Sequence, residues 1–172
     1  MDYIAHYESP LGQMTLASDG MSLTGLWFDG QKNFGASLAQ QHEERALPVF
    51  SEAKNWLDIY FSGKEPGFIP RLLLRGTLFQ REVWKLLLAV PYGHTTTYGA
   101  LADILAAQRH ILKMSARAVG TAVGHNPVSL IVPCHRIIGA SGALTGYAGG
   151  TDRKAKLLML EGNTISGRSV ML

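Results

Sequence analysis

The only cysteine of the chain, Cys134, lies in the sequence IVPCHRIIG, directly before His135 and Arg136. A thiolate is the reactive form of cysteine, and neighbouring cations lower the pKa of a thiol. We therefore interpret Cys134 as a candidate nucleophile and expect its basic neighbours to favour the thiolate. The alternative is that it is a small buried hydrophobic side chain, which is the commonest role of a free cysteine.

Three polar residues could assist this thiol. On a regular strand His135 would point away from Cys134, so it can act as a base only from an irregular turn or through a water molecule. Glu161 ends the apolar sequence LLMLEG, where a negative charge is unfavourable at a helix C-terminus, so we predict that it orients His135. Asn126 could tie down the turn before the cysteine. The alternatives are an exposed helix end for Glu161 and a plain helix cap for Asn126.

A stripe of small residues marks the predicted helix SARAVGTAVG. It comprises Ala116, Gly120 and Gly124 at four-residue spacing, and Arg117 and Thr121 lie beside it. Glycine costs a helix about 1 kcal/mol relative to alanine, so these glycines need a reason. One possible reason is close packing against another helix. The other is close approach to a nucleic acid, with Arg117 projecting toward it. A single arginine is too few for major-groove reading, so any DNA contact would rely on shape or on the minor groove.

The elements that position these residues fall into two predicted domains, 1–75 and 76–172. Apolar and polar residues alternate over residues 3–28 between turn sequences, which predicts an antiparallel sheet. A helical periodicity follows through Val49, Phe50, Ala53, Trp56, Leu57 and Tyr60. Residues 67–75 then form a linker or a last strand.

The second domain is predicted to be mostly helical. Thr77 caps a helix that Pro91 stops, a second helix starts near Thr97, and Ser115 caps the third. The glycine-rich sequence GASGALTGYAGG predicts a turn or hairpin, and Thr151 or Asp152 caps a last helix. This order is typical of a winged helix-turn-helix, so the chain as a whole is predicted to be α+β.

Charge and composition narrow the function. The net charge is +3, but residues 1–75 carry 6 basic and 9 acidic groups while residues 76–172 carry 10 and 4. A basic second half indicates an anionic partner such as nucleic acid. One cysteine cannot form an internal disulfide or a multi-thiolate zinc site. With no secretory signal and no apolar run of the ~20 residues that cross a membrane, we predict a cytoplasmic protein.

The sequences FQREVWK, TTYGALA, ARAVGTAVGHNP, PCHR, TGYAGG and KLLMLEG occur in this order. Together they resemble the O6-alkylguanine-DNA alkyltransferases. The resemblance implies an RNase H-like amino-terminal domain and a helical carboxyl-terminal domain with a winged helix-turn-helix. It implies a single, direct transfer of an alkyl group from O6-alkylguanine in double-stranded DNA, with O4-alkylthymine as a further candidate substrate. It also implies base flipping through the minor groove and a monomer without a cofactor. Some relatives bind zinc in the amino-terminal domain, but this domain contains no cysteine here, so we expect no metal.

The resemblance also implies roles for the catalytic residues. Cys134 is the alkyl acceptor and His135 is its base, acting through a water molecule. Glu161 orients His135, and Asn126 braces the turn that carries the cysteine.

The remaining roles implied by the resemblance concern the flipped base and the DNA. Tyr98 contacts guanine N3, Tyr147 and the N–H of Ala148 lie at O6, and the carbonyls of Cys134 and Ile137 accept from the exocyclic amine. Arg117 enters the base stack, while small or short residues let the backbone approach the DNA: Ala116, Gly120 and Thr121. The family commonly has serine at the position of Ala148, and residues 105–114 are longer than the usual family spacing.

Three other functions are weighed against alkyl transfer. A DNA-binding protein without chemistry would replace Cys134, as non-catalytic relatives of the family do. A cysteine hydrolase would have an atypically adjacent nucleophile and base, and its basic half would be unexplained. A regulator fused to repair activity would need a further metal-binding domain, for which this chain has too few residues and thiols.

Overall fold

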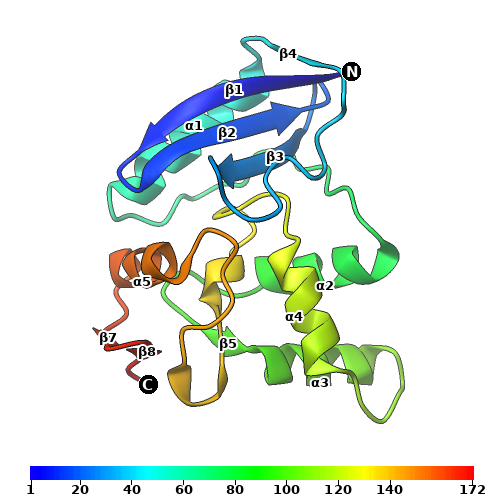
Figure 1. The fold of residues 1–172 in the computed structure, drawn as a ribbon, viewed down its shortest axis with the longest axis vertical. Coiled ribbons are helices and arrows are strands. Elements are labelled where there is room, and N and C mark those ends of the chain that lie inside the picture. Colours follow the sequence, from blue (N-terminus) through cyan, green and yellow to red (C-terminus); the bar gives the residue numbers. More distant parts are fainter. The chain divides into compact units, whose positions relative to one another are not determined.

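The computed structural model describes all 172 residues and divides into two compact units (Figure 1). The first unit contains Met1–Gly76 together with Pro127–Ile131, and the second contains Thr77–Asn126 and Val132–Leu172. The division is therefore not a single cut in the sequence, because a short segment from the middle of the second half returns to the first unit. The α+β class predicted from the sequence is confirmed.

The first unit is built on a four-stranded sheet of order β3-β2-β1-β4. Its strands are β1 (Asp2–Ser9), β2 (Gly12–Ser18), β3 (Leu23–Phe28) and β4 (His42–Glu44). The first three pair antiparallel, as the alternating pattern predicts, whereas β4 pairs parallel with the start of β1. On the other edge, Leu26 exchanges hydrogen bonds of 2.8 and 2.9 Å with Pro127 and Ser129, which attaches the returning segment to β3.

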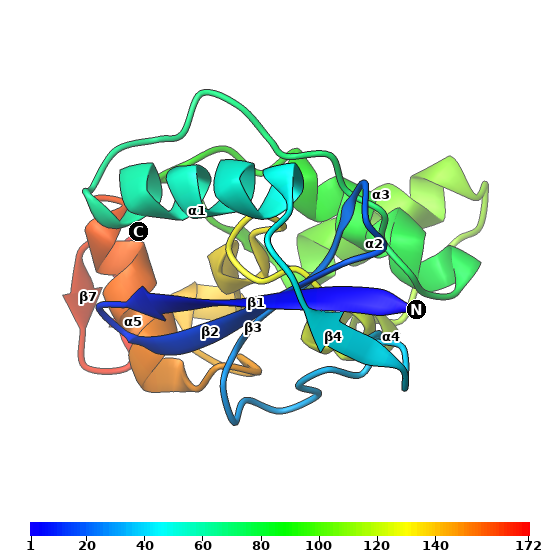
Figure 2. The same ribbon diagram turned by 90° about the horizontal axis from the view of Figure 1, so that it is seen from above.

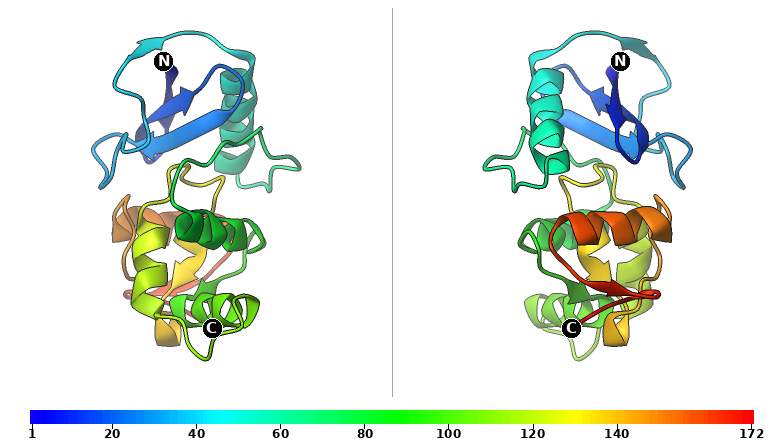
Figure 3. Two further views of the ribbon diagram at one scale, coloured as in Figure 1. Left: turned by 90° about the vertical axis from the view of Figure 1, so that its right-hand side faces the viewer. Right: turned by 90° about the vertical axis from the view of Figure 1, so that its left-hand side faces the viewer.

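Helix α1 (Pro48–Phe61) lies across one face of this sheet (Figures 2 and 3). All six residues of its predicted apolar stripe are buried. All six residues of β3 are buried as well, so this strand is covered on both faces. Within β3, Gly25 leaves room for the ring of Trp27, because a Cβ atom added there would lie only 2.0 Å from that ring.

The second unit contains helices α2 (Leu78–Leu88), α3 (Tyr98–Gln108), α4 (Ala116–Gly124) and α5 (Thr151–Leu160). The side chains of Thr77, Thr97 and Ser115 cap the first three helices, as predicted. The predicted cap of α5 is wrong. Gly150 occupies that position at a φ of 93°, which favours glycine, and Thr151 is already helical.

Helices α3 and α4 form the predicted helix-turn-helix and pack on α2, where Trp84 Nε1 donates 2.8 Å to the carbonyl of Ala122. Two short strands, β5 (Thr96–Thr97) and β6 (Ile137–Ile138), pair in parallel beside them. The glycine-rich segment after β6 forms a turn, η2 (Ala140–Gly142), rather than a hairpin of its own. Its partner is the terminal hairpin of β7 (Ile165–Ser166) and β8 (Ser169–Val170), through a bridge from Ala143 to Ser169.

Candidate active site

Cys134 begins a single turn of 3-10 helix, η1 (Cys134–Arg136), which follows Pro133 and leads into β6. This irregular turn explains how His135 can serve the site although it follows the cysteine directly. In a strand the two side chains would point to opposite faces, whereas a tight helical turn spreads successive side chains around its axis. His135 therefore lies in an irregular turn, which is the arrangement in which we expected it to be able to act as a base for Cys134.

The thiol itself is buried, and burial raises the pKa of Cys134. A side-chain hydrogen bond with Asn126 and the charge of Lys154 act in the opposite direction but do not outweigh burial. The expectation that the adjacent basic residues favour the thiolate is thus wrong for the resting protein. Because the low-dielectric surroundings disfavour the charged form, Cys134 is held as a thiol and needs a base at the moment of reaction.

The side chain of Asn126 connects the two ends of the loop formed by residues 127–131. Its Nδ2 atom donates 2.7 Å to the carbonyl oxygen of Val132, so it links the end of α4 to the residues just before the cysteine. The five residues between them, Pro127–Ile131, belong to the first unit. Asn126 therefore closes the second unit across this excursion and contacts the thiol as well.

His135 and Glu161 form a buried pair, in which Nε2 of the imidazole contacts Oε2 of the carboxylate. Burial lowers the pKa of His135, so the ring is neutral near pH 7. Burial alone would raise the pKa of Glu161, but hydrogen bonds from His135 and Arg136 outweigh it and lower this pKa to about 2. The pair thus consists of a neutral base and an ionised carboxylate.

Arg136 completes the surroundings of this carboxylate. Its Nε atom donates 2.7 Å to Glu161 Oε1, and the backbone N–H of Gly93 donates 3.1 Å to the same oxygen. The guanidinium also donates to the carbonyl of Val90 and lies 5.7 Å from the ring centre of Tyr92. Arg136, which lies two residues after Cys134, therefore stabilises the carboxylate of Glu161. The alternative of an exposed helix end is excluded, since Glu161 is 6% exposed.

Lys154 is a component of the site that the sequence prediction missed. It is fully buried, and its ammonium group donates to the carbonyl oxygens of Ile137 and Thr145. Burial lowers its pKa to about 8. A signal was present in the sequence, because Lys154 and Glu161 mark the two ends of one helical stripe with Leu157 and Leu158 between them.

The predicted base-binding residues gather near the same carbonyls. The hydroxyl of Tyr98 donates to the carbonyl oxygens of Thr145 and Gly146 at 3.1 and 3.3 Å. Tyr147 follows directly and is buried, although it lies in a glycine-rich segment. Ala148 is half-buried. The Ile137 carbonyl accepts from Lys154 and retains a second lone pair, as carbonyl oxygens do.

Helix α4 carries the predicted DNA-contacting face. Ala116, Arg117 and Thr121 are exposed, and Arg117 forms no ion pair. An added Cβ atom at Gly120 would meet the Tyr98 ring at an ordinary 3.5 Å, and one at Gly124 would meet nothing within 4 Å. Helix packing inside this unit therefore does not require either glycine.

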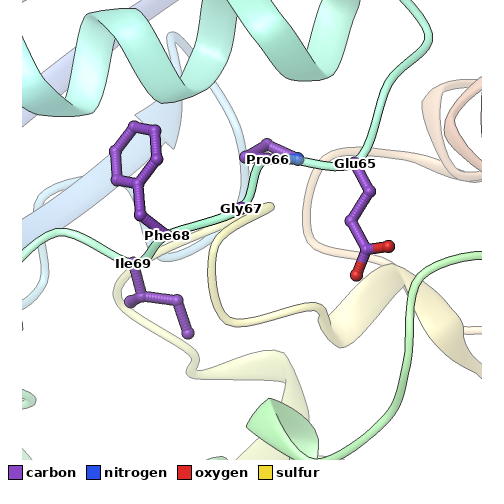
Figure 4. A pocket seen from close by; sticks show the side chains of 5 residues that line it. All are labelled: Glu65, Pro66, Gly67, Phe68 and Ile69. Carbon is purple, nitrogen blue, oxygen red and sulfur yellow. The ribbon is translucent and has the colours of Figure 1, made fainter.

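Other parts of the molecule offer less chemistry. A surface hollow lies against the loop from Glu65 to Ile69, in which Glu65 is the only ionisable residue (Figure 4). No group of three or more histidine, cysteine or acidic side chains could hold a metal ion. None of the helices is both long enough and apolar enough to cross a membrane. The chemistry-bearing side chains are thus concentrated around Cys134.

Comparisons with known proteins agree with this architecture. Residues 3–69 match the ribonuclease-like domain of 6-O-methylguanine DNA methyltransferase, and residues 78–163 match its DNA binding domain. A methylated-DNA–protein-cysteine methyltransferase of Mycobacterium tuberculosis is 48% identical over 159 residues, covering 91% of this chain and 92% of that protein. One from Methanosarcina acetivorans is 42% identical, covering 94% and 99%.

A solved structure gives the same result. The crystal structure of Mycobacterium tuberculosis OGT in complex with DNA has a TM-score of 0.80 to this chain, with 46% identity and 92% of each chain covered. The predicted fold, a ribonuclease-like domain followed by a DNA-binding domain, is therefore confirmed. The chain belongs to the 6-O-methylguanine DNA methyltransferase family.

Proposed function

We propose that this protein repairs DNA by moving an alkyl group from O6 of a modified guanine to the sulfur of Cys134. Membership of the methyltransferase family supports the reaction. We assign the acceptor to Cys134 because it is the single cysteine and it directly precedes His135 of the buried His135–Glu161 pair. An S–C bond forms while the C–O6 bond breaks, and the electron pair of the broken bond stays on the guanine. No atom is oxidised or reduced, so no cofactor is needed.

The protons balance through the side chains around the thiol. His135, as a neutral base, takes the thiol proton through a water molecule, and Glu161 stabilises the imidazolium that forms. The guanine takes up one proton as it leaves, so the proton that the thiol loses is balanced by the one that the guanine gains, and the product is neutral. The thioether left on Cys134 has no route back to a thiol, so each molecule acts once.

The base has to leave the duplex before a buried thiol can reach it. We assign the flipped guanine to the region of Tyr98, Tyr147, Ala148 and the carbonyls of Cys134 and Ile137. Arg117 would fill the gap in the stack, because it is an exposed and unpaired cation on α4. The open face of Ala116, Gly120 and Thr121 suits close approach to a backbone of any sequence, as repair requires.

The sequence predicts a cytoplasmic monomer, and nothing in the reaction requires a second subunit. O4-alkylthymine is a further candidate substrate, since it presents an alkyl group on a base oxygen of the same kind. DNA binding without chemistry is the competing function, and a test for methyl gain on the protein separates the two.

The test of the proposed function is intact mass spectrometry after incubation with a duplex that contains one O6-methylguanine. We expect each chain to gain one methyl group and no more, and the transferred amount to stop at one equivalent. Cys134→Ala is the matched control and should gain none. DNA binding without any gain in the wild-type protein would establish the competing function.

Glu161→Gln should slow methyl transfer by about 100-fold, because the amide no longer stabilises a protonated His135. The pKa of His135, followed by nitrogen-15 NMR, should fall further, because the carboxylate that favours the imidazolium is gone. Affinity for undamaged DNA should change little. Loss of DNA affinity in parallel with rate, or an unchanged His135 pKa, would show that Glu161 only supports the fold.

Arg117→Ala should weaken transfer from duplex DNA about 10-fold more than transfer from a free alkylated base. The difference corresponds to roughly 1.4 kcal/mol in holding the extrahelical base. Arg71→Ala, which removes an exposed arginine from the first unit, controls for net charge. An equal loss on both substrates would refute the assignment of Arg117 to the base stack.

A further inference from the structure

The loop that joins α3 to α4, residues 109–115, exposes apolar side chains in an unusual way. Leu112 is fully exposed, at 106% of its reference area, and Ile111 is 44% exposed. Figure 1 shows the loop projecting beyond the two helices of the helix-turn-helix. Ile111 and Leu112 together form an exposed apolar patch between polar neighbours, and such patches mark interaction sites.

The base of this loop is anchored. Arg109 makes hydrogen bonds of 3.0 and 2.6 Å to Glu82 on α2 and lies over the ring of Phe79 at 5.3 Å. His110 has a φ of 54°, which turns the chain sharply after α3. The N–H of Ile111 donates 3.0 Å to the carbonyl of Ala106. Because the loop is held at its start, Leu112 is presented without a large entropy cost on binding.

The loop is also basic. His110 and Lys113 are exposed on either side of the apolar pair and form no ion pair. The chain has no acidic residue at all between Asp103 and Asp152. The loop ends at Ser115, two residues before Arg117, and so continues the exposed face of α4. Charge and position both match a polyanion lying along α4.

We propose that this loop is a second DNA contact, in which Leu112 packs into the groove beside the gap held by Arg117 and Lys113 binds a phosphate. Apolar wedges flanked by cations are a common device of proteins that bind the minor groove. The inference rests on the proposed DNA-repair function. A second copy of this chain fits less well, because two identical basic loops would repel each other.

The experiment measures binding of the full-length protein to an undamaged labelled duplex by fluorescence anisotropy over a range of salt concentrations. Leu112→Ser should lower the affinity about 10-fold, and Leu112→Met should retain it. Lys113→Gln should reduce the slope of log K against log salt by about 1, since one phosphate contact is lost. Met21→Ser, at an exposed apolar residue of the first unit, is the control and should bind like wild type.

Wild-type affinity and salt slope in both loop variants would overturn the inference. So would sedimentation velocity showing that the wild-type protein self-associates without DNA and that Leu112→Ser abolishes this. Thermal melting checks that the variants fold, which is expected because Leu112 makes no core contact. Methyl gain by the wild-type protein is measured separately, so a failure of this inference is distinguishable from a failure of the proposed function.

Discussion

The ionised carboxylate of Glu161 in the protein interior is the constraint on which the rest of the site depends. An isolated buried carboxylate would cost several kcal/mol, so it requires paired charge and hydrogen bonds. Here the imidazole of His135, the guanidinium of Arg136 and the N–H of Gly93 supply them. These partners come from separate segments, and the second unit has to bring all of them to the end of α5.

The ionised carboxylate determines the state of the imidazole. A carboxylate only accepts hydrogen bonds, so Nε2 of His135 must donate to it, and a neutral ring then carries its lone pair on Nδ1. The base is therefore prepared before substrate arrives. Cys134, in contrast, is kept as a thiol by burial. A resting thiol reacts slowly with oxidants, which suits an acceptor that can be used only once.

Many features of the fold could be predicted from the sequence, because they depend on residues that are close together in the chain. The caps at Thr77, Thr97 and Ser115 and the buried stripe of α1 depend on nearby residues alone. The rest depended on contacts distant in sequence. The pairing of Arg136 with Glu161, the return of residues 127–131 to the first unit and the burial of Tyr147 involve segments whose approach no local pattern records. Burial also reversed the expected effect on the thiol.

The protonation state of His135 tests this account most directly. Nitrogen-15 NMR of histidine-labelled protein at pH 7 would report both ring nitrogens of His135 in the unreacted enzyme. We expect a neutral ring with its proton on Nε2, and no conversion to imidazolium until the pH falls below the ordinary histidine value of about 6.5. An imidazolium at pH 7, or a neutral ring with its proton on Nδ1, would contradict it.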